Sequence, residues 1–421
     1  MKKYFVWFVV AALAAGLACR RAEIGTPLGT TYQQIARPAI WRVLPHSQAE
    51  TLGLEPGDVV MSYNDEPVTT TEQLVQFQFQ AVASRERIPM TVLRGDAEMK
   101  LMVEPGVLGV LPDAERYTGS LAVAIQDVLG HYGVTVDYDW LAALTGESFA
   151  FTARNGGCRG AWPGGLAGDY LDGLTQQYGL TFRTVFAGDA DSARTADAVQ
   201  QEALAAVRDR LSRGRLVLVF GVWPGNNGES WAVATRYDPA DSLVYGYTLG
   251  SAGEVALSGT FEEAYEVGHR ATGEPDPADM LTTVLTQGLE LGQAYADSGW
   301  QSGIAAYDVW IGALDTVPFC AVSPDSGKSD FDRLIWTLLA NKESANRFLQ
   351  DMREAIPEQS ELVDGIIDDN NTIIGKLNGI IQSGIRPGTL ERQQKLAKAV
   401  NEVQIIETDL LGRYEELIGE L

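Results

Sequence analysis

The sequence predicts a multidomain α+β protein with three folded parts. A chain of 421 residues is longer than one hydrophobic core usually serves, so two or three domains are expected. Strand patterns and turn signals fill residues 25–106, and helical and strand patterns are mixed over residues 107–272. Over residues 273–421 the apolar residues recur at helical spacing. We therefore expect a small β-barrel-like domain, an α+β domain and a C-terminal antiparallel helical bundle.

Residues 1–19 have the pattern of an export signal. A pair of lysines precedes an apolar run that is too short to cross a membrane comfortably. The run ends in "GLAC", which resembles a bacterial lipoprotein lipobox with Cys19 as the lipidated residue, although Gly16 stands where leucine is usual. This resemblance implies an exported protein of the cell envelope, anchored by lipid to a bacterial membrane and facing the periplasm or the exterior. The alternative is a cleaved secretory signal with an incidental cysteine.

Charge and histidine spacing exclude some classes of function. The chain has 56 acidic and 32 basic side chains and a formal net charge of −24, with no long basic run to offset it. Because phosphate backbones bind cationic surfaces, nucleic acid is not an expected partner. His46, His131 and His269 lie far apart in the sequence. Neither a metal site nor a cofactor is therefore predicted.

Residues 25–106 have the signals of a small β-rich domain. "AIWRV" predicts a strand, "HSQAETLG" a short helix, and "LEPGD" a tight turn, in which proline fixes φ and glycine tolerates positive φ. "VVMSYN" alternates as a strand, and "TTTEQLVQFQFQAV" begins a helix with a threonine cap. "IPMTVLRGDAEMKLMVEP" predicts a hairpin of two strands around the turn "RGDA".

This order of elements resembles a circularly permuted PDZ domain, of the kind found in bacterial periplasmic proteases. The resemblance rests on "AETLGLEPGDVVMSYNDEPV" and on the later "TVLRGD". It implies a peptide-binding loop and the start of an edge strand that an extended peptide would join, formed by Pro27, Leu28, Gly29, Thr30, Thr31 and Tyr32. The stretch "PLGTTYQQIARP" is more polar than the usual loop. The alternative is a PDZ fold that serves only as a spacer or docking surface.

Residues 107–272 mix helices and strands. A helix begins near Ser120, and "TADAVQQEALAAVRDRLSRG" predicts an amphipathic helix that ends at Gly214. "RLVLVFGVW" reads as a buried strand, and "SWAVATRYDP" and "SLVYGYTLG" as an antiparallel pair.

A helix followed by a twisted sheet resembles the papain-like superfamily. The chain is also similar to the N-terminal domain of butirosin biosynthesis protein H in "GSLAVAIQDVLGHYGVTVDYDWLAALTGESFAF", "LSRGRLVLVFGVWPGNNGESWAVATRYDP" and "SGIAAYDVWIGAL". The superfamily places a catalytic cysteine at the start of the first helix and a histidine at the start of the strand after the buried one. Ser120 stands at the cysteine position and Trp231 at the histidine position. Because an indole cannot accept a proton, the resemblance implies a degenerate site.

Ser120 has two interpretations. As a serine before an apolar helix it is expected to be the N-cap, and the alternative is a nucleophile, which needs a neighbouring base. His131 ends the same helix, about 16 Å away at the helical rise per residue, so it is poorly placed. Asp238 and Glu229 lie near the predicted strand, with no evident base to orient. Trp231 is expected to fill the core or line a pocket.

Cys158 is a second candidate nucleophile. It lies in the glycine-rich "NGGCRGAWPGG", where Arg159 would lower the pKa of a thiol. No histidine neighbours it in the sequence. A loop thiol, or a disulfide between Cys158 and Cys320 in an exported protein, is the alternative.

Residues 273–421 predict a helical bundle. "FDRLIWTLLANKESANRFLQDMREAI" is a helix capped by Ser329 or Asp330, and the last helix begins at Thr389. The pair Asp368–Asp369 is expected on a solvated face rather than at a metal site. A partner-binding coiled coil is the alternative to a packed bundle. Residues of the last helix at steps of three and four define the buried stripe: Leu396, Val400, Val403, Ile406, Leu410, Tyr414 and Leu417.

Together these observations predict a non-catalytic, lipid-anchored envelope protein. Its PDZ module would bind a protein C-terminus or an extended peptide, its degenerate papain-like module would bind a ligand, and Cys19 would attach it to the membrane. The first alternative is an acyltransferase or amide hydrolase that acts through Ser120 or Cys158. The second is a regulatory partner of an envelope protease. Fold resemblance alone does not decide between them.

Overall fold

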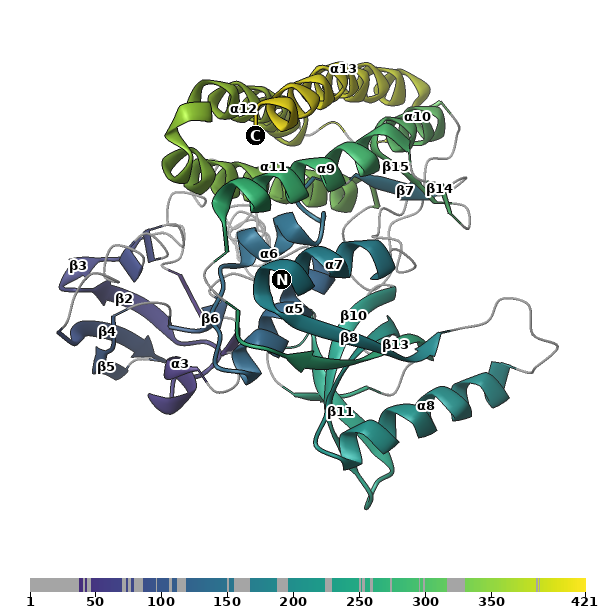
Figure 1. The fold of residues 1–421 in the computed structure, drawn as a ribbon. Coiled ribbons are helices and arrows are strands. Elements are labelled where there is room, and N and C mark those ends of the chain that lie inside the picture. The colour runs from purple at the N-terminus through teal and green to yellow at the C-terminus, as the bar shows by residue number, and fades with distance from the viewer. Residues whose placement is uncertain are drawn as a thin grey trace, which may run out of the picture. The chain divides into compact units, whose positions relative to one another are not determined.

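The computed structural model describes residues 38–421, apart from residues 41, 44–46, 70–72, 75–76, 79–85, 96, 106–107, 112–118, 150, 155–166, 188–195, 224–228, 250, 252–253, 258–259, 273–274, 295, 298–299, 316–329, 384 and 386. The fold is mixed α+β, with several antiparallel sheets and a C-terminal helical region, as the sequence predicts (Figure 1). Backbone contacts divide the chain into two compact units. The first comprises residues 1–41 and 55–108, and the second comprises residues 42–54 and 109–421.

The first unit contains a four-stranded antiparallel sheet. Its order is β3-β2-β4-β5, formed by β2 (Val59–Tyr63), β3 (Glu66–Pro67), β4 (Ile88–Arg94) and β5 (Ala97–Val103). Asn64 and Asp65 both adopt positive φ, as a two-residue hairpin turn between β2 and β3 requires. Gly95 has a φ of 57° in the turn between β4 and β5. The predicted hairpin is therefore confirmed.

An ion pair joins the turn before β2 to the end of β4. Asp58 is buried, and its carboxylate accepts hydrogen bonds from Arg94 Nε at 2.7 Å and Nη2 at 2.8 Å. Burial alone would raise the pKa of Asp58, but the bonds from Arg94 and from the backbone N–H of Glu55 hold that pKa below its ordinary value. This ion pair therefore links the predicted "LEPGD" turn to strand β4.

The second unit is built on a six-stranded antiparallel sheet of order β12-β11-β10-β9-β13-β8. Strand β9 is central and almost wholly buried, as the apolar run "LVLVFGV" predicts. The predicted antiparallel pair is also present as β10 and β11. The strands are β8 (Leu180–Ala187), β9 (Leu216–Val222), β10 (Glu229–Asp238), β11 (Leu243–Thr248), β12 (Val255–Ala256) and β13 (Thr260–His269).

Helices cover both faces of this sheet. Helix α8 (Ala196–Ser212) packs on the face that carries Ala232 and Ala234. Helix α5 (Ser120–His131) contacts β10 and β11 on the other face, to which Trp231 and Val233 alternate. Helices α6 (Tyr138–Leu144) and α7 (Ala167–Tyr178) follow α5. The two-stranded pair of β1 (Arg42–Val43) and β6 (Val110–Leu111) and helix α3 (Gln48–Thr51) also belong to this unit.

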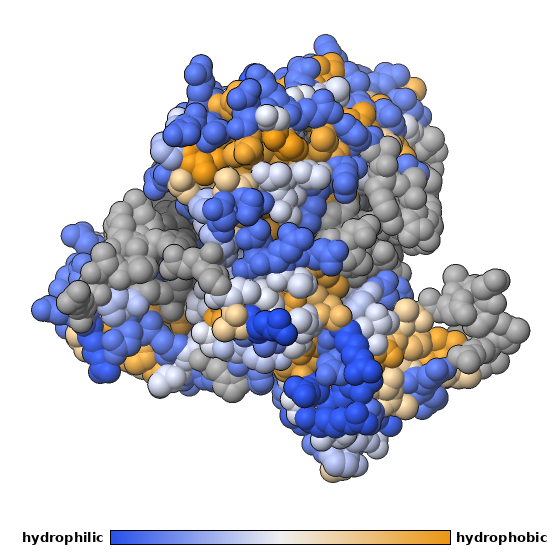
Figure 2. All heavy atoms as spheres, viewed as in Figure 1, coloured by the Kyte–Doolittle hydropathy of each residue, from blue (hydrophilic) through white to orange (hydrophobic). Residues whose placement is uncertain are grey.

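The C-terminal helices form an antiparallel bundle above a small sheet of β7 (Thr152–Arg154), β14 (Ala296–Asp297) and β15 (Trp300–Ser302) (Figure 1). Figure 2 shows hydrophobic residues along the seam between the bundle helices and hydrophilic residues over their outer faces. Among the described residues, no helix is long and apolar enough to span a membrane. The bundle helices are α9 (Pro277–Ala294), α10 (Gly303–Leu314), α11 (Asp330–Ala355), α12 (Ser360–Ser383) and α13 (Leu390–Glu420), with a short 3-10 turn, η2 (Pro357–Gln359), before α12.

The predicted buried stripe of α13 is correct except at one position. Ile406 is only half-buried, and Glu407 takes the buried position next to it. Glu407 Oε1 accepts a hydrogen bond from Lys342 Nζ on α11 at 2.5 Å, and both side chains are almost fully buried. A charged residue can occupy the stripe because its partner neutralises it there.

Candidate functional site

The first turn of α5 is the position where the sequence predicted a degenerate catalytic site. The N-cap is Gly119, whose backbone is extended and which has no side chain to cap the helix. The carboxylate of Glu147, in the loop after α6, accepts hydrogen bonds from the backbone N–H of Leu121 at 3.1 Å and of Ala122 at 2.8 Å. A third backbone N–H, from Ser120, also points to this carboxylate. Glu147 therefore satisfies the N–H groups that a helix leaves free at its start.

Glu147 is fully buried, and its carboxylate lies next to the positive N-terminal end of α5. Burial raises the pKa of Glu147 to about 7, and the backbone N–H groups of Ala122 and Leu121 and the Thr145 hydroxyl oppose that rise. The hydroxyl of Tyr138 accepts a hydrogen bond from the N–H of Gly119 at 2.9 Å. The result is a closed arrangement in which the helix N-terminus already holds an internal acidic group.

Ser120 is the first residue of α5 and is buried. The expectation that it caps the helix is wrong, because Gly119 is the N-cap and Glu147 binds the free N–H groups. Ser120 Oγ instead accepts a hydrogen bond of 3.1 Å from the backbone N–H of Trp231. Within the described part of the chain, this hydroxyl makes no hydrogen bond to a side chain of His, Asp, Glu or Lys. A backbone N–H cannot take its proton, so this contact does not activate a nucleophile.

Trp231 fills the core beside this turn. Its side chain is 1% exposed, and its ring lies 5.2 Å from that of Phe220 and 6.1 Å from that of Tyr265, both in tilted arrangements. The indole Nε1 is buried and has no hydrogen-bond partner among the described residues. The predicted role of Trp231 as a core residue matches this packing.

His131 and His269 lie away from Ser120, and His46 lies outside the described residues. His131 ends α5, a helix of 12 residues that begins at Ser120. The next residue, Tyr132, stacks on His269 at the end of β13, with ring centroids 5.3 Å apart. Both histidines therefore gather at the opposite end of α5 from the hydroxyl that they would have to serve.

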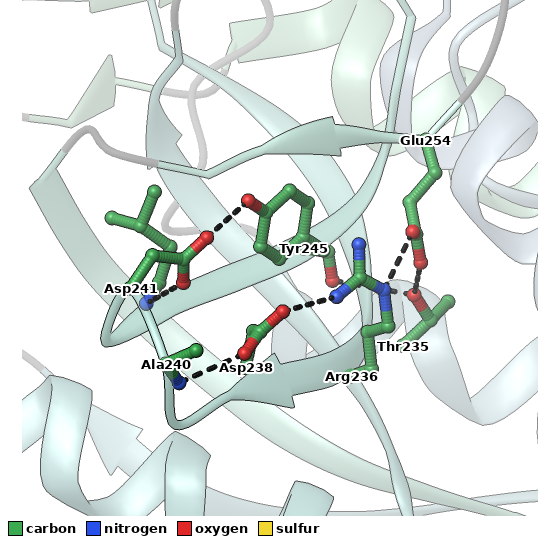
Figure 3. A network of polar contacts seen from close by, with 8 residues as sticks. Thr235, Arg236, Asp238, Ala240, Asp241, Tyr245 and Glu254 are labelled. Atoms are coloured by element: carbon green, nitrogen blue, oxygen red, sulfur yellow. Dashed lines mark hydrogen bonds and ion pairs between the residues drawn. The ribbon is translucent and has the colours of Figure 1, made fainter.

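Asp238, one candidate to orient a base, is the last residue of β10, next to the turn into β11 (Figure 3). Its carboxylate accepts a hydrogen bond from Ala240 N at 2.9 Å and lies 3.5 Å from Arg236 Nη1. Arg236 also binds Glu254 and stacks over the Tyr245 ring at 3.7 Å (Figure 3). Asp238 is therefore part of a surface network of the β10–β11 hairpin, and the partners it has there are not histidines that it could orient.

Other predicted site residues lie outside the described residues: Cys19, Cys158, Cys320 and the predicted peptide-binding residues Pro27, Leu28, Gly29, Thr30, Thr31 and Tyr32. The side chain of Glu229 is also outside them. Among the described residues, no group of three His, Cys, Asp or Glu side chains is arranged to hold a metal ion.

Sequence reasoning missed Glu147 and Tyr138. Both follow α5 in the chain, and neither lies in a local capping motif, because the helix they serve begins many residues earlier. The only signal is a single glutamate in "LTGESFAF", a stretch with no other charged residue. No protein-family model matches the chain, and no curated protein is significantly similar to it.

Proposed function

We propose that the chain is a non-catalytic, lipid-anchored protein of a bacterial cell envelope that binds an extended peptide or a protein C-terminus through residues 25–106. The observation that carries the non-catalytic part is the bond from the Trp231 backbone N–H to Ser120 Oγ. In a papain-like arrangement this oxygen would face a base. Here it joins a helix to a strand, beside a buried tryptophan.

The first turn of α5 supports the same reading. An acyl-transfer site needs donors that face the developing oxyanion, and a helix N-terminus often supplies them. In this chain the carboxylate of Glu147 binds the N–H groups of Leu121 and Ala122. A substrate oxyanion would have to displace a buried acidic group, so the site favours a structural role.

The binding part of the proposal rests on the first unit. Its sheet of β2, β3, β4 and β5 and the tight turns between the strands support the PDZ-like interpretation of residues 25–106. A sheet of this kind recognises peptides by adding a strand at an edge, with main-chain hydrogen bonds. By the resemblance, Gly29 lies in the loop that would hold the terminal carboxylate.

The test is peptide binding by the complete mature chain. We expect fluorescence anisotropy with a library of random heptapeptides to select sequences that bind with a free C-terminal carboxylate and bind more weakly when that terminus is amidated. Gly29→Val should weaken the selected peptides about tenfold, whereas Gly375→Ala, in helix α12, should not. If no peptide is selected, or if amidation has no effect, the proposed recognition is wrong.

Two further measurements address the anchor and the chemistry. Cys19→Ser should move the protein from the membrane fraction to the soluble fraction after cell lysis, and Cys320→Ser should leave it in the membrane fraction. Hydrolysis of an activated ester by the wild type should equal that by Ser120→Ala. A rate that falls in Ser120→Ala would revive a nucleophilic role for this hydroxyl.

A further inference from the structure

A small cavity of about 260 Å³ lies beside helix α5 in the second unit. Leu216 of β9 and Val233 of β10 contribute buried apolar side chains to its lining. Asp127 and His131, four residues apart on α5, and Tyr247 of β11 contribute polar ones. The cavity therefore combines an apolar surface with polar groups, as small-molecule sites do, and it shares no residue with the first turn of α5.

Asp127 is the observation that points to a ligand. This residue lines the cavity although it is only 3% exposed. It has other interactions with its surroundings, but its Oδ1 atom is buried and has no hydrogen-bond partner among the described residues. A buried carboxylate oxygen without a donor is unfavourable, and such an atom usually accepts a hydrogen bond from a ligand, an ion or water. The lining is thus completed by a donor that the described part of the chain does not supply.

The other carboxylates set the sign of the charge. Glu254 already has partners, because it accepts hydrogen bonds from Arg236 Nε at 2.8 Å and from the Thr235 hydroxyl at 2.7 Å (Figure 3). Glu50, exposed on α3, adds another carboxylate to the lining. No lysine or arginine lines the cavity. The surplus of negative charge favours a ligand that is a cation.

The shape and the donor set favour an organic cation. Within the described ranges, no three His, Cys, Asp or Glu side chains are arranged to hold a metal ion. The volume is below the range of about 300–1,000 Å³ that drug-sized ligands need, so only a small molecule fits. Leu216 and Val233 suit a hydrocarbon group, and the half-buried Tyr247 offers an aromatic ring that attracts an ammonium group.

We propose that this cavity binds a small primary amine, with one ammonium group and a short apolar arm. The ammonium group would donate to the Asp127 carboxylate, and the arm would contact Leu216 and Val233. Charge-assisted hydrogen bonds of this kind are among the stronger polar contacts in proteins. The site lies in the second unit and does not depend on peptide binding by residues 25–106, so either proposal can fail alone.

The test is ligand-observed NMR titration of the complete mature chain with 3-methylbutylamine. A sodium chloride concentration of about 150 mM screens long-range attraction to the acidic surface, and a pH of about 8 keeps histidine side chains neutral. The matched probe is 3-methylbutan-1-ol, which has the same arm and no charge. We expect saturable binding of the amine and at least tenfold weaker binding of the alcohol.

Two variants address the cavity itself. Asp127→Asn removes the buried charge at nearly constant size and should weaken the amine about tenfold. Because Asp127 is buried, this variant is first compared with the wild type by circular dichroism. Glu50→Lys changes an exposed residue and places a cation in the lining, so it should also weaken the amine about tenfold. If Asp127→Asn does not fold, Glu50→Lys decides the question.

Exposed acidic residues on α13 supply the matched controls. Asp409→Asn and Glu416→Lys make the same changes in net charge away from the cavity, and both should bind the amine as the wild type does. Non-saturable binding of the amine, or equal binding of the alcohol, would overturn the proposal. So would equal weakening by Glu50→Lys and Glu416→Lys, because that result would assign the binding to the overall charge of −24.

Discussion

The backbone N–H of Trp231 donates a hydrogen bond of 3.1 Å to the hydroxyl oxygen of Ser120, which joins the start of β10 to the first turn of α5. The two residues are 111 positions apart in the chain. The pairing of β10 with β11 begins one residue later, at Ala232, so the Ser120 hydroxyl gives the buried N–H of Trp231 an acceptor from the helix. Ser120, which stands at the position of a nucleophile in the resemblance, therefore stabilises the contact between α5 and β10.

Ser120→Ala should destabilise the protein by about 1–2 kcal/mol, because the buried N–H of Trp231 loses its acceptor. Urea unfolding followed by tryptophan fluorescence measures this. Ser212→Ala is the control, since the Ser212 hydroxyl bonds the Asp209 carbonyl at an exposed place, and its effect should stay within about 0.5 kcal/mol. Equal losses in the two variants would contradict the assigned role.

Glu147 should make the protein less stable as pH rises from about 4.5 to about 7. Burial raises the pKa of Glu147 to about 7 in the folded chain from its ordinary value of about 4.5, so the unfolded chain releases its proton first. The difference of about 2.5 units corresponds to about 3 kcal/mol, which is present below pH 4.5 and lost by about pH 7.

The measurement is the free energy of unfolding of the wild type and of Glu147→Gln across this range. The variant removes the titrating group, so the difference between the two curves should change by about 3 kcal/mol between pH 4.5 and pH 7. Glu416→Gln, at an exposed position on α13, should give a curve parallel to that of the wild type. A constant difference for Glu147→Gln would show that Glu147 keeps an ordinary pKa.

Gly119→Ala should destabilise the protein by about 1–3 kcal/mol. A Cβ at this position would overlap Glu147 Oε2 and lie 2.7 Å from Glu147 Cδ, and hydrogen bonds hold that carboxylate in place. Gly412→Ala is the matched control, because its Cβ would meet nothing within 4 Å and alanine favours a helix. Thermal unfolding should show a lower Tm for Gly119→Ala and an equal or higher Tm for Gly412→Ala.

Lys342→Met should destabilise the bundle by about 3–5 kcal/mol, because it leaves the buried Glu407 carboxylate without its cation. The double variant Lys342→Met/Glu407→Leu should recover much of that loss, since no buried charge remains. Lys395→Met removes the exposed pair with Glu391 and should change stability by less than about 0.5 kcal/mol. Urea unfolding of the wild type, both single variants at Lys342 and Glu407 and the double variant gives the coupling energy of the pair. A double variant that is less stable than Lys342→Met would contradict the assigned role of this ion pair.

Local signals predicted much of the fold. The threonine cap of the last helix is confirmed, because Thr389 Oγ1 accepts a hydrogen bond from Arg392 N. The hairpin of β4 and β5 and the buried strand β9 also follow their apolar patterns. In these places the interactions that decide the structure lie within a few residues of one another.

Partners distant in the chain explain what the sequence could not predict. Glu407 reads as a solvent-facing residue beside Ile406, and its burial depends on Lys342 from another helix. Glu147 takes the capping role that the pattern assigned to Ser120. The spacing of apolar residues along the sequence carries no information about such long-range side-chain pairs.

The place of β13 has a consequence for the order in which the chain can fold. This strand lies between β8 and β9, so the sheet has a gap until residues 260–269 have been made. Helix α5, whose residues are nearly all buried, leaves the ribosome long before the strands that it covers. The six-stranded sheet therefore cannot close before residues 260–269 have been synthesised, and a chain that stops before Thr260 would expose apolar surface to its neighbours.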